Sequence, residues 1–533
     1  MSTDKSTHDQ EAPQRGPDSP RSIIKSMSLL SVGTLSSRIL GFFRDVILAK
    51  LLGTGIRADA FFVALKIPNL FRDFVGEGAT NSAVVPILTE YLQKRRRESF
   101  WRFASVVLTL ALIVLSAVTL LGIVFAPVIV RMIAPGFMVD PDKLLLTIHL
   151  TRIMFPYLVF IGLTAYCMGI LFTFRSFLVP AFSPCLLNIS VIASAFIASR
   201  TMEEPVFGLA IGVLVGGVLQ LAVQVRPLLK TGMKFKRPKT LCHPGAMKIG
   251  KLLIPRMIGS GVYQLTVLID TFCASLAMIV GQGGISAIYY SNRIIQFPMG
   301  VFSIALASAV LPSLSGLAAK KDTESIKRVV IFALENIFFV MAPTMVMLLL
   351  FAVPIIRVLF QRGEFTTYST GITSLALSFY ALGLFSFGGI KILVTAFHAL
   401  QDTKTPVKIA AFCLGLNAAL NFILMVPLKI GGIALASAIA GTIDFLALFY
   451  IMNKRLGRFN SGLLVYFLKV TFAALLTGIF ADAVWVHATF SREFIKLGAA
   501  GFSGFLFYGL ICLFLQVEQA HKIVEWVKRG LGR

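Results

Sequence analysis

The stretch Ser36-Ser-Arg-Ile-Leu-Gly-Phe-Phe-Arg-Asp45 opens an apolar segment, residues 36–91, that carries several charges within what should be membrane-spanning sequence. A charge at the centre of a bilayer costs roughly 2.5–3.5 kcal/mol even on mild insertion scales. We therefore expect the charged side chains of this segment to face a protein-lined or water-filled space. They are Arg38, Arg44, Asp45, Asp59, Arg72, Asp73 and Glu77.

The composition of the whole chain is typical of a polytopic membrane protein. Of its 533 residues, 56% are hydrophobic and only 14% are charged, whereas about 25% of the residues in soluble domains are charged. Apolar blocks of about 20 residues, the length that spans a bilayer, recur along the chain between residues 24 and 517. The predicted fold class is all-α, a polytopic membrane protein with about 14 transmembrane helices.

Basic residues between the blocks predict the orientation of the chain. The formal net charge is +25, and most of the surplus follows even-numbered blocks, as in Lys94-Arg-Arg-Arg97 and Lys454-Arg455. Loops that face the cytoplasm are enriched in lysine and arginine. Both termini and all even-numbered loops are therefore predicted to be cytoplasmic. The same rule explains the surplus better than a nucleic-acid partner, so no nucleic acid is expected.

The motifs favour a transporter without an ATP motor over an enzyme. The six cysteines are scattered, with none of the CxxC or CxxH spacings of zinc sites. The chain contains no Walker motif, GxGxxG, HExxH or Ser/His/Asp context. We therefore expect no catalytic residue. The energy for transport would come from an ion gradient, the membrane potential or the substrate gradient.

A weak internal repeat divides the chain. Lys66-Ile-Pro68 leads to Val85-Pro86 in the first half, as Gln296-Phe-Pro298 leads to Leu311-Pro312 in the second. Parallel repeats of this kind are a common transporter plan, with the substrate site between the two lobes. The predicted domains are a disordered cytoplasmic tail (1–22), an N-lobe of spans 1–6 (23–240), a C-lobe of spans 7–12 (241–458), and spans 13–14 with a cytoplasmic tail (459–533).

The embedded charges allow two interpretations. Residues seven apart share a face of a helix, as Arg38 and Asp45 do, and Asp73 and Glu77 are i, i+4 neighbours. In the first interpretation, these groups pair with one another and only lock helices together. In the second, arginines without a matched acid bind a phosphate-bearing substrate through their planar five-donor fork. The second is favoured for Arg38, Arg72 and Arg293.

A different polar group is predicted in the second half of the chain. Asp270 lies alone in one apolar block, and Asn417 and Asn421 share a face of another. A carboxylate with carboxamide oxygens offers the ligands that a hard cation such as sodium takes. Hydrogen bonding between helices is the alternative.

Several long motifs point to a known family. They include Ser37-Arg38-Ile-Leu-Gly-Phe-Phe-Arg44-Asp45, Lys66-Ile-Pro-Asn-Leu-Phe-Arg72, Phe360-Gln-Arg-Gly-Glu-Phe365 and Ala396-Phe-His-Ala-Leu-Gln-Asp-Thr-Lys-Thr-Pro406. These motifs closely resemble the MurJ/MviN family, the lipid II flippases of peptidoglycan synthesis in the MOP exporter superfamily. The resemblance runs from about residue 23 to the end of the chain, and it is looser in the last two apolar blocks.

The resemblance implies a fold and a mechanism. It implies two six-helix lobes plus two extra helices around a central cavity that alternates between inward-open and outward-open states. The extra helices would form a groove for a lipid tail. The cargo would be lipid II, an anionic polyprenyl-pyrophosphate glycolipid, moved from the inner to the outer leaflet of the bacterial cytoplasmic membrane. We expect the chain to work as a monomer in contact with the phospholipid bilayer.

The family pattern also assigns site residues. The substrate pyrophosphate would contact Arg38, Arg44, Arg72 and Arg293. The acids interpreted as gating or structural residues are Asp45, Asp59, Asp73 and Glu77. A sodium site described for some members matches Asp270, Asn417, Asn421 and Ser437. Asn421 departs from that pattern, which has an aspartate at this position. No cofactor other than this sodium ion is expected.

Other functions share parts of this pattern. An exporter of another polyprenyl-linked oligosaccharide would use the same arginines. A cation-coupled multidrug antiporter would be expected to have a less basic cavity, with more acids and aromatic residues. A non-transporting scaffold for cell-wall enzymes would tolerate replacement of Arg38, Arg72 or Arg293 without consequence.

Overall fold

The structure, a computed structural model of the chain, describes residues 20–75, 84–235, 238, 240–241, 243–457 and 462–531. All regular elements in these ranges are helical, as predicted. In the first half of the chain they are α1 (Pro20–Leu52), α2 (Ile56–Val75), α4 (Val85–Lys94), α5 (Arg97–Val124), α6 (Ala126–Ile133), η2 (Pro135–Val139), α7 (Pro141–Met154), α8 (Tyr157–Thr173), α9 (Leu178–Thr201) and α10 (Pro205–Lys230).

The second half of the chain continues in the same way. Its helices are α11 (Pro244–Ser275), α12 (Ala277–Val280), α13 (Gly284–Pro298), η3 (Met299–Ser303), α14 (Ile304–Ala319), α15 (Thr323–Leu350), α16 (Ala352–Phe360), α17 (Thr367–Leu382), α18 (Leu384–Ala399), α19 (Lys404–Leu428), α20 (Ile430–Leu456), α21 (Gly462–His487), α22 (Glu493–Phe514) and α23 (Glu518–Leu531).

The long helices account for the predicted apolar blocks. In the described chain, ten helical segments are long and apolar enough to cross a membrane, and α17 with α18, bent by 47°, makes an eleventh. Three further long helices, α1, α2 and α11, fall on the apolar blocks predicted near 24–52, 60–92 and 249–281, and each carries charged residues within its length. The arrangement is consistent with fourteen spans.

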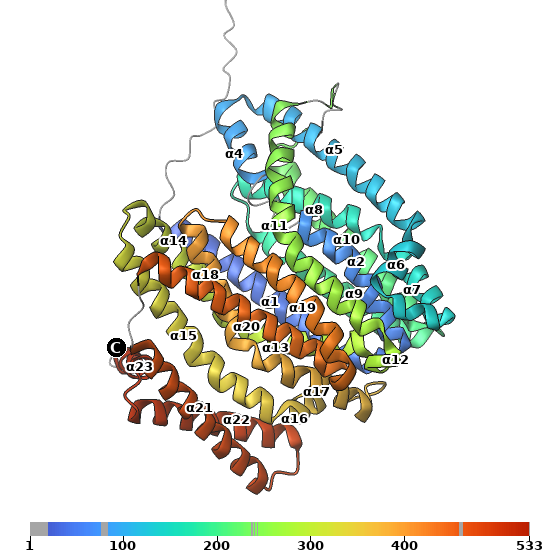
Figure 1. The fold of residues 1–533 in the computed structure, drawn as a ribbon. Helices are drawn as coiled ribbons and strands as arrows, with labels where there is room; N and C mark the ends of the chain where they lie inside the picture. The colour runs from blue at the N-terminus through green and yellow to red at the C-terminus, as the bar shows by residue number, and fades with distance from the viewer. Residues whose placement is uncertain are drawn as a thin grey trace, which may run out of the picture.

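The spans gather into two groups and a flanking pair. In the group α1–α10, called the first lobe, α1 packs along α9, α9 along α10, and α2 against α7 and α8. In the group α11–α20, called the second lobe, α11 packs against α19, α19 against α20, and α15 against α18. Helices α21 and α22 pack against each other at one side of the bundle, with α21 on α15 (Figure 1).

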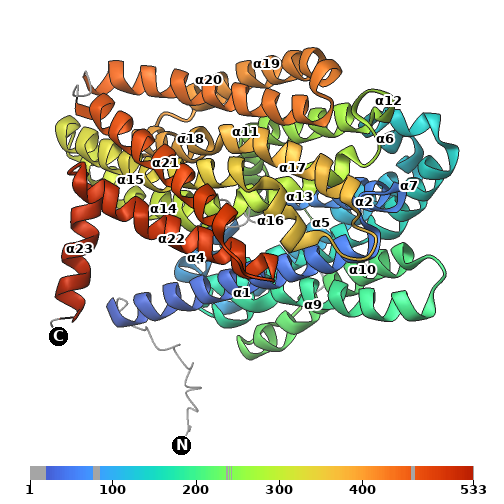
Figure 2. The same cartoon turned by 90° about the horizontal axis from the view of Figure 1, so that it is seen from below.

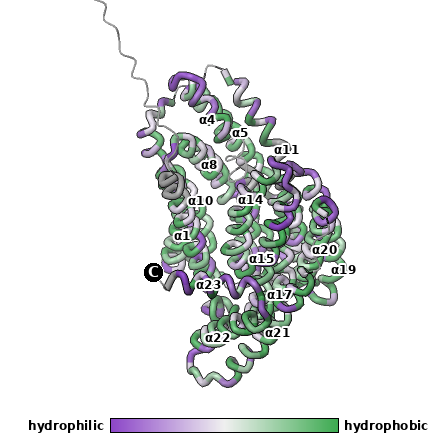
Figure 3. Tube along the Cα trace, turned by 90° about the vertical axis from the view of Figure 1, so that its left-hand side faces the viewer, coloured by the Kyte–Doolittle hydropathy of each residue, from purple (hydrophilic) through white to green (hydrophobic). Residues whose placement is uncertain are grey.

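The two ends of the bundle differ. Figure 2 shows that α1 begins, α20 ends and α23 lies at one end, called the basic end because it carries Lys454 and Arg455. Figure 3 shows hydrophilic residues concentrated near helix ends, around α4 and in α23. Because lysine and arginine mark cytoplasmic loops, the basic end is the one predicted to face the cytoplasm.

The lobes contact each other at the opposite end, where α1 stops at Leu52. The backbone N–H of Glu364 donates to the carbonyl of Lys50 at 2.9 Å, and the Thr54 and Ser369 hydroxyls are 2.8 Å apart. Gly53, with φ of +59°, makes this approach possible because a β-carbon there would overlap the Glu364 carbonyl. A side chain at Gly53 would therefore push the lobes apart at this end.

The second-lobe helix that faces α1 and α2 is interrupted. Helix α13 ends at Pro298, and η3, a π-helical turn, separates it from α14. Proline has no N–H to donate and crowds the preceding turn, and π-turns are frequent at functional sites. The repeated Gln296-Phe-Pro298 motif therefore marks a break close after Arg293.

Candidate functional site

Asp45 of α1 is fully buried and joins arginines from both lobes. The guanidinium of its neighbour Arg44 lies 2.7 Å from Oδ1 of the carboxylate, and Nε of Arg293, from α13, lies 2.5 Å from Oδ2. Arg44 also donates through Nη1 to Oδ1 of Asn188 on α9 at 3.1 Å. Two of the four predicted pyrophosphate ligands are thus brought together on one acid.

The hydroxyl of Tyr289 completes this group. It donates to Oδ1 of Asp45 at 3.0 Å and accepts from Arg44 at 3.0 Å and from Arg293 at 2.9 Å. Its ring stacks on Phe62 of α2, with the ring centroids 3.9 Å apart. We call Arg44, Asp45, Asn188, Tyr289 and Arg293 the Asp45 cluster.

The sequence predicted only part of this cluster. It left Arg293 without a matched acid, and the structure pairs it with Asp45. It gave no role to Tyr289 or Asn188. The available signal for Tyr289 was its i, i+4 spacing to Arg293, which places the two side chains on one face of a helix. No local pattern marked Asn188, which is more than a hundred residues from α1.

The other two predicted arginines lie apart from the cluster. Arg38 is exposed and sits nearer the basic end, about 9 Å along α1 from Arg44 for six residues of helix. Its Nη1 atom lies against Gly300 of η3, where any β-carbon would overlap the guanidinium. Arg38 therefore also lies between the lobes. Arg72 is half-buried in the last turn of α2.

Asp59 lies at the opposite end of the bundle and bridges three helices. Its carboxylate is 2.8 Å from Nζ of Lys143 on α7, and it accepts from the backbone N–H and hydroxyl of Ser286 on α13 at 3.0 and 2.6 Å. The Lys143 ammonium also lies over the Phe137 ring. No pattern in the sequence marked Lys143 or Ser286. The side chains of Asp73 and Glu77, predicted as further acids, lie outside the described residues.

The four residues of the predicted sodium site are in contact with one another. Asn421 donates to Oδ1 of Asp270 at 2.8 Å and to Asn417 at 3.2 Å, while Ser437 donates to Oδ2 of Asp270 at 3.1 Å. Lys66 of the first lobe donates at 2.5 Å to Thr271, which is next to Asp270 in the second lobe. A cationic side chain from the other lobe therefore lies beside this group.

The donor set of this group fits a monovalent cation better than a transition metal. Asp270 is its one carboxylate, and the described residues contain no group of three or more His, Cys, Asp or Glu that could hold a metal. Oδ1 of Asn421 is buried and has no hydrogen-bond partner among the described residues. An acceptor left free beside a carboxylate is what a cation would use.

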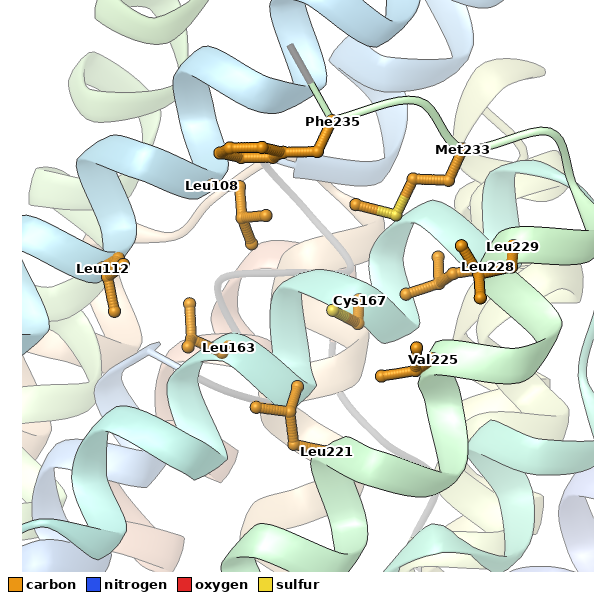
Figure 4. A pocket seen from close by; sticks show the side chains of 10 residues that line it. All are labelled: Leu108, Leu112, Leu163, Cys167, Leu221, Val225, Leu228, Leu229, Met233 and Phe235. Carbon is orange, nitrogen blue, oxygen red and sulfur yellow. The ribbon is translucent and has the colours of Figure 1, made fainter. Parts of the chain in front are cut away.

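Two cavities lie elsewhere in the described part of the bundle. One cavity of about 320 Å³ lies between α5, α8 and α10 and is lined by apolar side chains such as Leu112, Leu163 and Val225 (Figure 4). It offers nothing to a charged headgroup. A second, of about 570 Å³, lies at the opposite end beside Lys143 and Gln282. The Asp45 cluster, between the lobes, remains the place where anion-binding groups converge.

Comparisons with known proteins agree with one another. Residues 48–499 match the family profile described as lipid II flippase MurJ. The chain is 34% identical over 483 residues to the probable lipid II flippase MurJ of Buchnera aphidicola subsp. Schizaphis graminum, covering 89% of this chain and 93% of that protein. It is 34% identical over 459 residues to the lipid II flippase MurJ of Burkholderia cenocepacia, covering 85% and 88%.

Solved structures extend the comparison to the fold. A lipid II flippase MurJ in an inward closed conformation superposes with a TM-score of 0.78 at 29% identity, over 92% of this chain and 99% of that one. An inward-facing MATE-family multidrug transporter of the MOP superfamily superposes with a TM-score of 0.66 at 17% identity, over 82% and 98%. The second likeness concerns the fold alone.

Proposed function

The chain belongs to the MurJ family of lipid II flippases, and we propose that it carries lipid II from the inner to the outer leaflet by alternating access of its two lobes. Lipid II is the precursor of peptidoglycan, so the activity serves cell-wall synthesis. The chain is a multi-pass membrane transporter. We further propose that the basic end faces the cytoplasm of the bacterial inner membrane, which would place both termini there.

The observation that supports this mechanism is the meeting of Arg44 and Arg293 on Asp45. One carboxylate faces two guanidinium groups from different lobes, so the cluster carries an excess of positive charge between them. A pyrophosphate offers more anionic oxygens than a carboxylate and suits the planar fork of arginine. We propose that the headgroup takes the place of Asp45 as the partner of these arginines.

Arg38 and Arg72 would extend the same site. Arg38 is exposed between the lobes and nearer the basic end, so it would contact the pyrophosphate before Arg44 does. Arg72 on α2 would supply a further contact. Steering an anion along arginines of this kind needs no ATP, because attraction by the cavity offsets the loss of water around the headgroup.

Release to the other side would require the opposite end to open. That end is held by Asp59 with Ser286 and by the contacts of Thr54 and Lys50 with the second lobe. We propose that Asp59 is a gating acid and that these contacts break in the outward-open state. The polyprenyl tail would stay in the membrane, in a groove formed by α21 and α22.

Sodium is the cation that we propose for the Asp270 group. The cation would be held by Asp270 and by the oxygens of Asn421, Asn417 and Ser437. Lys66 from the first lobe lies beside this group, so a bound cation and Lys66 would repel each other. Cation binding would in this way weaken a contact between the lobes, which is how an ion gradient would contribute to their movement.

The test is complementation of cells depleted of their own lipid II flippase. We expect wild-type chain to restore lipid II in the outer leaflet and Arg38→Ala to fail at equal protein level. Arg102→Ala is the matched control, since Arg102 is exposed on α5 and, among the described residues, its ion pair is with Glu98 one turn away on the same helix. Failure of the wild type would overturn the function, whereas full activity of Arg38→Ala would remove Arg38 from the site.

A further inference from the structure

Helix α23, which follows the last span, has two different faces. Ile523, Trp526 and Val527 are spaced i, i+3, i+4 and form an apolar stripe that is exposed, with Trp526 76% accessible. Glu525 and Lys528 lie on the opposite face, and Lys522 and Arg529 lie at the border of the stripe. Helices with an exposed apolar stripe and a charged opposite face are typical of the membrane interface.

The base of this helix is fixed to the last spans. Val517 and Ala520 are buried in a cluster with residues of α15, α21 and α22. The side chain of Gln519 donates to Glu335 of α15 at 3.1 Å. The Lys522 ammonium lies over the Phe332 ring. The start of α23 is therefore part of the packed bundle, while its apolar stripe is not.

The turn before α23 sets its direction. Gln516 has φ of +56°, and the backbone N–H of Val517 donates to the carbonyl of Cys512 at 2.9 Å, which closes the end of α22. As a result α23 runs crosswise to α22 at the basic end (Figure 2). Since α22 is a candidate span, a helix that crosses it at its end lies along the plane of the membrane surface.

We propose that α23 is a membrane-interface helix whose apolar stripe inserts into the phospholipid surface at the basic end. Only three residues separate it from α22, so it cannot leave the surface by more than about 10 Å. The side chain of Phe514, at the end of α22, is also exposed, at 87%. Tryptophan prefers this depth of the bilayer because its ring is apolar and its N–H is polar.

The charges of α23 favour anionic lipid headgroups. Lys522 and Arg529 each have an acid one turn away on the same helix, whereas no ion pair of Lys528 is seen among the described residues. Basic residues close to an anionic membrane surface are attracted to it. The consequence for transport follows only if α21 and α22 hold the substrate tail as proposed above: α23 would then fix the depth of that pair in the membrane.

The test places a fluorophore on each face of α23 in the full chain. Val527→Cys and Glu525→Cys are two residues apart and therefore roughly 200° apart on the helix. Both are made with Cys242→Ser, because the other five cysteines are buried. The labelled proteins are placed in nanodiscs of phosphatidylcholine and phosphatidylglycerol that contain nitroxide-labelled lipid.

We expect quenching of the probe at 527 to exceed that at 525 several-fold, and Lys528→Glu to reduce the difference in phosphatidylglycerol. Equal quenching at both positions would overturn the proposal. So would a probe at 527 that is shielded from water but not quenched, because a second copy of the chain or another protein would then cover the stripe. The measurement needs no transport, so it stands apart from any failure of the flippase function.

Discussion

Nε of Arg293 lies 2.5 Å from Oδ2 of Asp45, so a single buried carboxylate of α1 connects the first lobe to α13 of the second. The residues are 248 positions apart in sequence, from 293 − 45. Arg44 uses the other oxygen of the same carboxylate. This relationship makes the centre of the molecule sensitive to any change in the charge of Asp45.

We expect Asp45→Asn to lower the free energy of unfolding by roughly 3–5 kcal/mol and to abolish transport, because two largely buried arginines lose their counter-charge. Denaturant titration in detergent and the complementation assay measure the two effects. Asp482→Asn is the control, since Asp482 is exposed on α21. A stable and active Asp45→Asn protein would show that the arginines have no need of this acid.

The two adjacent tyrosines of α13 give a matched pair. Tyr289→Phe removes a hydroxyl that bonds Asp45, Arg44 and Arg293, so we expect a loss of roughly 1.5–3 kcal/mol of stability and reduced transport. Tyr290→Phe removes a buried hydroxyl that has no hydrogen-bond partner among the described residues, and little change is expected. Equal effects of the two substitutions in unfolding assays would contradict the role given to Tyr289.

The Asp59–Lys143 pair should show strong energetic coupling. Interacting residues show coupling energies of roughly 0.5–3 kcal/mol. A double-mutant cycle with Asp59→Asn and Lys143→Gln is expected to give a value near the top of this range, because both groups are buried. The exposed Arg57–Glu204 pair is the control, with an expected coupling below about 1 kcal/mol. Similar values for the two pairs would argue against a special role for Asp59.

Asn421→Asp tests the proposed cation site. The new carboxylate would lie beside Asp270, to which Asn421 now donates at 2.8 Å, and two like charges at this distance repel each other. We expect a lower melting temperature without sodium and a larger rise when sodium is added than in the wild type. Potassium and choline salts control for ionic strength. If sodium fails to stabilise either protein, no such site exists at Asp270.

Asp402 makes stability depend on pH at the basic end. The backbone N–H of Thr405 and its hydroxyl donate to this carboxylate, Arg455 lies 2.9 Å away, and together they lower the pKa of Asp402 below its usual 3.8. A carboxyl whose pKa is lower in the folded state than in the unfolded state stabilises the fold at pH values above its unfolded-state pKa. This stabilisation is lost as the pH falls through the folded-state pKa. Asp402→Asn should therefore lower the melting temperature at pH 7, with the difference from the wild type vanishing in strong acid. A difference that persists unchanged would point to the N-terminus of α19 rather than to charge.

Much of the fold could be predicted from residue order. Apolar blocks long enough to span a membrane gave the helices, because in lipid only a helix or a closed barrel satisfies every backbone hydrogen bond. The bends were not predicted: Pro298 lies at the break before η3, and Gly383 lies at the bend between α17 and α18. Prolines interrupt the hydrogen-bond ladder directly, whereas a glycine only permits a bend.

The candidate site was predicted in composition but not in pairing. The charges of residues 36–91 indicated a polar interior, and Asp270 was rightly grouped with Asn417, Asn421 and Ser437. The roles assigned to these residues in substrate and sodium binding stay predictions. The partners Lys143, Ser286 and Tyr289 were missed, because helical periodicity gives only the face of a helix and not the helix that it meets.

The sequence by itself determined that this chain is a polytopic helical membrane protein of the MurJ family and that its apolar spans carry charged residues, because a charge within an apolar span is costly and therefore conspicuous. The tertiary structure alone decided which of these residues meet. Contacts such as Arg293 with Asp45, Asp59 with Lys143 and Lys66 with Thr271 join helices far apart in the chain. They depend on how whole helices pack, which no local pattern of residues encodes.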